Sequence, residues 1–143
     1  MEQQITEPTA EDIEGLARQL VLVRALSAEH LGRALSDDDT DLDVLQQLLD
    51  AGALAPDQTY ELQSLGVVFG MRLVEALGGV DWVIVEDEYG RDPALRYLNT
   101  SLLFFPLTMI SKRIESGEHV AVRDLFQGVC AEINKLRAEL GPC

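Results

Sequence analysis

Five aspartates lie within seven residues of the sequence: Asp37, Asp38, Asp39, Asp41 and Asp43. Carboxylates at this density resemble an EF-hand calcium loop, but such a loop has Gly at its sixth position and Glu at its twelfth. A loop begun at Asp37 or at Asp39 has neither residue. Acidic side chains near a helix N-terminus are stabilised by the helix dipole, and this effect explains two or three of the five aspartates. We interpret the surplus negative charge as a surface for a basic partner.

A second acidic group, Glu86-Asp87-Glu88, precedes the turn predicted at residues 89–93. Paired carboxylates perform acid–base chemistry when burial drives their pKa values apart. Three consecutive residues at a strand end cannot all be buried, and Arg91 is near enough in sequence to neutralise one of them. We therefore expect an exposed turn.

The remaining residues capable of chemistry form no known motif. His30 and His119 lie far apart in the sequence, too few for a zinc site. We expect Cys130 to be a core thiol with a raised pKa, and Cys143 is the last residue. Nucleophile-elbow, Walker and dinucleotide-binding motifs are absent from the sequence. The sequence thus predicts no catalytic, cofactor-binding or metal-binding residue, and no enzyme.

Net charge narrows the class of partner. The chain has 143 residues and a formal charge of −14; residues 1–64 contribute −11 of this charge and residues 65–143 contribute −3. The acidic half would repel nucleic acid and anionic membranes and attract a basic protein, although acidity also favours solubility. An acidic start without an apolar run and two isolated cysteines favour a cytoplasmic location.

The first half of the sequence reads as helices. Thr9 is placed to cap a helix with Ile13, Leu16, Ala17, Leu20 and Val23 at helical spacing. A short helix is expected at 28–35, begun by Ser27, and another after Thr40, a second predicted cap. Leu42, Leu45, Leu48 and Leu49 give this helix its apolar side, and Gly52 ends it.

A longer helix is predicted from Thr59 to Leu77, with Gly66 and Gly70 on its inward face for close packing. Val80–Asp87 alternates as a strand containing Trp82, which is expected to anchor the core. Residues 94–97 and 101–105 form either two short strands or one bent strand. Pro106 suits the first position of a helix, and the last helix spans about 120–140.

We therefore predict a mostly α, α+β fold: a helical N-terminal half, a small antiparallel sheet at about 80–105, and a long C-terminal helix. The 143 residues fit one domain, of which residues 1–8 are expected to be flexible.

Residues 65–133 resemble a bacterial family described as domain of unknown function 3806. Leu65-Gly66 with Gly70, Trp82 after Gly78-Gly79, Asp87-Glu88-Tyr89-Gly90, Phe105-Pro106 and Lys112–Gly117 carry the resemblance. It implies no activity. It also places residues 10–52, the most acidic part of the chain, outside the family core.

Small, acidic bacterial domains without catalytic motifs also resemble immunity proteins of contact-dependent or type VI secretion toxins. This resemblance implies a non-enzymatic inhibitor whose acidic helix occupies the basic active site of a cognate toxin that acts on nucleotides or nucleic acids. The expected partner-binding residues are Asp37, Asp38, Asp39, Asp41, Asp43, Gln46, Gln47 and Asp50.

Two alternatives stay open. One is a small enzyme or ligand-binding domain with a site near Glu86–Arg91 and Lys112–Arg113. The other is a homodimeric structural module that pairs through an exposed face of the last helix.

Overall fold

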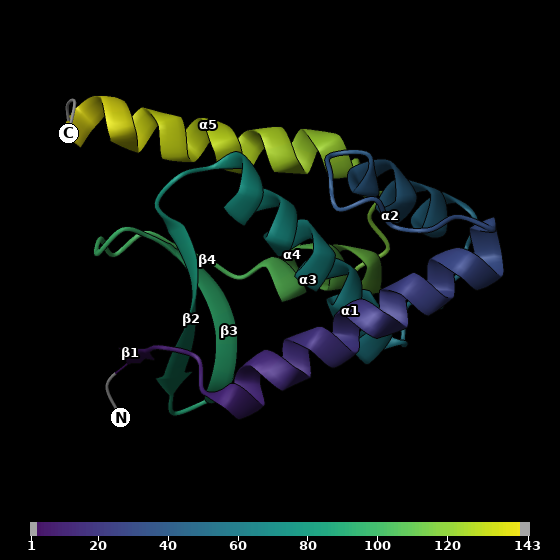
Figure 1. The fold of residues 1–143 in the computed structure, drawn as a ribbon, viewed down its shortest axis with the longest axis horizontal. Helices are drawn as coiled ribbons and strands as arrows, with labels where there is room; N and C mark the ends of the chain where they lie inside the picture. Colours follow the sequence, from purple (N-terminus) through teal and green to yellow (C-terminus); the bar gives the residue numbers. More distant parts are fainter. Residues whose placement is uncertain (1–2, 141–143) are drawn as a thin grey trace.

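The computed structural model describes residues 3–140, which form five helices and a four-stranded antiparallel sheet (Figure 1). The elements follow in the order β1 (Gln4–Thr6), α1 (Ala10–Leu31), α2 (Asp41–Asp50), α3 (Thr59–Ala76), β2 (Val80–Asp87), β3 (Gly90–Tyr97), β4 (Leu103–Phe104), α4 (Pro106–Glu115) and α5 (Val122–Leu140). The predicted fold class is confirmed: the protein is α+β and mostly α, with a long C-terminal helix.

The sheet is a meander in the spatial order β1-β2-β3-β4. Strand β2 has the predicted bounds, but β3 begins at Gly90, so most of the segment expected to be a turn is strand. Pro93 is tolerated there because β4 pairs only with Leu95 and Arg96, which leaves Pro93 at an open edge. Gln4–Thr6, within the segment expected to be flexible, forms β1 and pairs with residues 84–86 of β2.

Helix α1 is one continuous helix, not the two predicted. Thr9 caps it as expected, and Asp12 completes a capping box. Ser27, read as the start of a second helix, is instead buried within α1 and donates its hydroxyl hydrogen to the carbonyl of Arg33. Gly32, with φ at 63°, ends the helix in the left-handed conformation. Ile13, the first residue of the apolar pattern noted in the sequence, is 58% exposed.

Helix α3 forms the centre of the molecule and contacts the other four helices and β2. Leu62, Leu65, Phe69 and Leu73 are buried along it. Its two glycines allow the close packing predicted: a Cβ on Gly66 would collide with the backbone of Pro106 and Leu107, and one on Gly70 would lie 2.7 Å from the Trp82 ring. Trp82 is partly buried and packs against the core, as expected.

Helix α5 runs along one side of the molecule, from α2 toward the sheet end (Figure 1). Its buried residues include Val122, Val129 and Ile133. Cys130 packs against the core, and burial raises the pKa of its thiol. Cys143 lies outside the described residues. No helix among residues 3–140 has the length and apolar character needed to cross a membrane.

Candidate functional site

The acidic segment predicted to bind a partner lies in the loop before α2 and in α2 itself. Asp41, its central carboxylate, is only 1% exposed. It accepts hydrogen bonds from the backbone N–H groups of Ser36 (2.8 Å) and Asp37 (3.1 Å). A carboxylate used in this way holds the loop against the start of α2. The structure thus gives Asp41 an internal role, and we do not include it in the proposed partner surface.

Asp38 shapes the same loop, and Thr40 does not take the capping role that the sequence suggested. Thr40 makes no side-chain cap; instead, both its hydroxyl and its N–H donate to Asp38, the latter over 2.9 Å. The Thr40 hydroxyl is the main reason that the pKa of Asp38 is lowered. Arg72 on α3 is buried and close enough for its charge to contribute to this shift.

Asp43 joins α2 to the first turn of α5. Arg123 donates to both of its carboxylate oxygens, over 2.9 and 3.0 Å. This hydrogen bonding lowers the pKa of Asp43 and raises that of Arg123. Arg123 also approaches Asp39 to 3.6 Å. One guanidinium thus neutralises part of the acidic cluster from a distant part of the chain.

Gln46 makes a second connection between the same helices. Its amide nitrogen donates to the carbonyl of Val120 (2.9 Å), and its amide oxygen accepts from the N–H of Val122 (2.7 Å). Gln46 also donates to Asp50 (3.0 Å), while Gln47 accepts from Arg33 (2.9 Å). Both glutamines predicted to bind a partner are thus already engaged within the protein.

The carboxylates of Asp37, Asp39 and Asp50 are presented to solvent, with side chains that are 63%, 74% and 57% exposed. Asp38 is exposed as well, but it already accepts hydrogen bonds from Thr40. The basic side chains nearest to Asp37, Asp39 and Asp50 are those of Arg24, Arg123 and His119, at 3.6–3.8 Å, and they are themselves exposed. Ion pairs of this kind contribute little to stability. We call Asp37, Asp39 and Asp50 the exposed acidic set.

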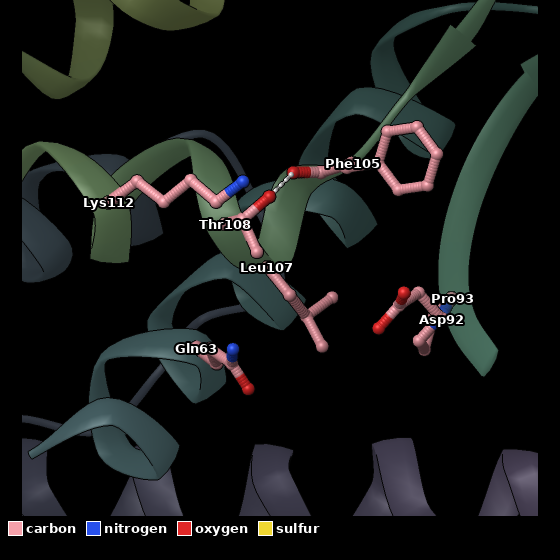
Figure 2. Close-up of a pocket in the computed structure, with 7 residues that line it drawn as sticks. All are labelled: Gln63, Asp92, Pro93, Phe105, Leu107, Thr108 and Lys112. Carbon is pink, nitrogen blue, oxygen red and sulfur yellow. Dashed lines mark hydrogen bonds between the residues drawn. The ribbon is translucent and has the colours of Figure 1, made fainter. Parts of the chain in front are cut away.

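A pocket of about 270 Å³ lies elsewhere, between α3, β3 and α4 (Figure 2). Its wall combines the apolar side chains of Pro93, Phe105 and Leu107 with four polar ones. These are Gln63, Asp92, Thr108 and Lys112. Thr108 donates its hydroxyl hydrogen to the carbonyl of Phe105 (3.2 Å), which leaves its oxygen lone pairs available.

The pocket overlaps only partly with the ligand site considered from the sequence. Lys112 lines it, but Arg113 bonds the carbonyl of Met109 (2.7 Å) instead. Arg91 binds Asp12 at 2.5 Å and approaches Glu86 to 4.0 Å, while Glu88 is exposed at the turn. The lining residues come from three separate elements, so no local spacing marks them, and sequence reasoning missed all except Lys112.

The sequence model of domain of unknown function 3806 matches residues 41–126, more than half of the chain. The chain belongs to this family. The match begins at the start of α2, so the sequence expectation that residues 10–52 lie outside the family core is wrong for Asp41, Asp43 and the rest of α2. No curated protein matches the chain.

Among solved structures, a protein of Bacteroides thetaiotaomicron VPI-5482 has a similar fold. Its crystal structure, at 1.50 Å resolution, superposes with a TM-score of 0.84 at 17% sequence identity. The match covers 91% of this chain and 48% of the other, so the chain spans about half the length of that protein. At this identity, the likeness establishes the fold alone.

Proposed function

We propose that this domain is a non-enzymatic binding protein that recognises a basic protein surface through its exposed acidic set. The supporting observation is that the aspartates of the acidic segment fall into two groups, one bonded within the protein and one exposed. Asp41 and Asp43 are held by internal contacts, whereas Asp37 and Asp39 remain largely exposed beside them. The partner class we propose is the basic active-site domain of a cognate bacterial toxin, which the domain would occlude in the cytoplasm.

Electrostatic attraction is the physical basis of the proposal. Complementary charge speeds association by steering diffusional encounter, and salt screens this effect. Exposed carboxylates affect mainly the association rate, whereas desolvated pairs affect dissociation. The exposed acidic set should therefore act mostly on the association rate at low ionic strength.

The test begins with affinity capture of a partner from the native lysate, followed by stopped-flow association at several salt concentrations. The variant Asp37→Asn/Asp39→Asn should associate more slowly than wild type at low salt, by roughly tenfold, and should depend less on salt. The matched control Asp81→Asn/Glu88→Gln removes the same charge from exposed residues of β2 and its turn and should associate like wild type.

Equal slowing of both double variants would show that total charge, and not this surface, determines association. No effect of Asp37→Asn/Asp39→Asn would rule out recognition by the exposed acidic set. Circular dichroism of each variant would show that the fold is retained, as expected for exposed residues.

A further inference from the structure

The pocket between α3, β3 and α4 contains one anionic and one cationic side chain that do not neutralise each other. Asp92 lies on β3 and Lys112 on α4. Among residues 3–140, neither forms an ion pair within 4.0 Å, with the other or with any third residue. We propose that this pocket binds a small zwitterion with an apolar group, the chemistry of a free amino acid or a short peptide. This site is separate from the exposed acidic set.

The α4 wall is suited to the ligand carboxylate. Lys112 lies one helical turn after Thr108, so both side chains project from the same side of α4, as Figure 2 shows. Thr108 lies in the first turn of α4, whose N-terminus carries no side-chain cap. An uncapped helix N-terminus favours a negative group nearby. The lysine, the hydroxyl and the helix dipole thus favour the same charge.

The opposite wall is suited to the ligand ammonium group. In Figure 2, the carboxylate of Asp92 points from β3 into the pocket, toward Leu107. Asp92 makes no side-chain hydrogen bond with any residue of the described chain, so its oxygens are free to accept from an ammonium donor. The Gln63 side chain reaches the pocket from α3 and adds an amide donor and acceptor.

Apolar side chains lie between the two charged walls. Leu107 is 9% exposed, and Phe105 and Pro93 are partly buried. The pocket has a volume of about 270 Å³. This space suits an amino acid or a dipeptide and is smaller than the usual pocket for a drug-sized ligand.

The experiment is a titration of the full ¹⁵N-labelled chain with L-phenylalanine, followed by amide NMR. A ligand of about twelve heavy atoms at ordinary efficiency should have a Kd on the order of 1 mM, a range that NMR measures well. We expect saturable shifts at the Gln63 side-chain amide and at the amides of Leu107 and Thr108. N-acetyl-L-phenylalanine lacks the ammonium group and L-phenylalaninamide lacks the carboxylate, so each should bind about tenfold more weakly.

Two variants test the assigned charges. Asp92→Asn and Lys112→Gln should each weaken L-phenylalanine binding about tenfold. The controls Asp81→Asn and Lys135→Gln, both at exposed positions outside the pocket, should leave binding unchanged. L-alanyl-L-phenylalanine distinguishes the ligand sources: tighter binding than the amino acid indicates a peptide, and weaker binding a free amino acid.

The proposal is overturned if neither zwitterion gives saturable shifts at the pocket, or if the singly charged analogues bind as well as L-phenylalanine. Unchanged binding by both pocket variants would also overturn it. These results do not depend on a protein partner, so they leave the test of the exposed acidic set unaffected.

Discussion

The variant Gly66→Ala adds one methyl group where α3 and α4 meet. The new Cβ would lie 2.5 Å from the Cα of Leu107 and 2.9 Å from the carbonyl carbon of Pro106. Both are backbone atoms, so neither can rotate away as a side chain could. Carbon atoms pack at ~3.5–4.0 Å, so α3 and α4 must separate by about 1 Å.

The expected magnitude follows from two opposing effects. Overpacking of this kind costs ~1–3 kcal/mol, while Ala is favoured over Gly inside a helix by up to ~1 kcal/mol. We therefore expect Gly66→Ala to lower the free energy of unfolding by about 1–2 kcal/mol. Gly128→Ala on α5 is the matched control: no atom lies within 4 Å of its Cβ, so it should stabilise the protein by ~0.5–1 kcal/mol.

Urea denaturation followed by circular dichroism measures both changes, with an unchanged m-value indicating that only stability has altered. Gly70→Ala should fall between the two variants, because its Cβ meets the Trp82 ring at 2.7 Å and Pro106 Cγ at 3.0 Å, side-chain atoms that can shift. Trp82 is the single tryptophan, so its fluorescence would report that shift. A Gly66→Ala protein as stable as wild type would refute the close-contact argument.

Three further changes test the structural roles of polar residues in the N-terminal half. Asp41→Ala removes the acceptor of two backbone N–H groups and should lower the free energy of unfolding, measured with urea, by ~1–3 kcal/mol. The control Asp39→Ala should lower it by less than ~0.5 kcal/mol. Equal losses in the two variants would contradict the structural role of Asp41. Hydrogen bonding from the Thr9 backbone is the main cause that lowers the pKa of Asp12, so its NMR titration midpoint should lie below that of an ordinary aspartate. Because the folded pKa lies below the unfolded one, the stabilisation is complete above about pH 4 and is lost as the pH falls through the folded pKa. Asp12→Asn should therefore reduce the fall of the free energy of unfolding at acid pH. An unchanged acid dependence in this variant would exclude the contribution of Asp12. Gln46→Ala should speed hydrogen exchange in the first turn of α5, with Gln47→Ala as the control, because only Gln46 bonds that turn.

Elements with local signals were predictable from the sequence. Alternating apolar residues define β2, Pro106 marks the first position of α4, and Gly52 ends α2 with φ at 64°. These features depend only on neighbours within a few residues, so the local sequence is enough to predict them. The predicted fold class followed from them.

Elements set by distant contacts were not predictable. Strand β1 exists because residues 4–6 pair with residues 84–86, and nothing in the first eight residues marks this partner. Serine often caps helices, yet Ser27 lies inside α1, where it is buried and donates to the carbonyl of Arg33. Likewise, the pocket combines α3, β3 and α4, and only tertiary packing brings them together.

The acidic segment shows why residue type alone does not identify a binding surface. Asp39 and Asp41 have the same side chain and lie two positions apart, but one is exposed and the other holds the loop through two backbone hydrogen bonds. Asp41 and Asp43 fall within the family match that begins at residue 41, whereas Asp37 and Asp39 precede it. Changing the charge at these two positions removes only their exposed ion pairs with Arg24 and Arg123. The hydrogen bonds of Asp41 and Asp43, which join α2 to the loop and to α5, are kept. A loss of partner association in Asp37→Asn/Asp39→Asn with unchanged stability would consequently report on recognition, and a loss in Asp41→Ala would report on folding.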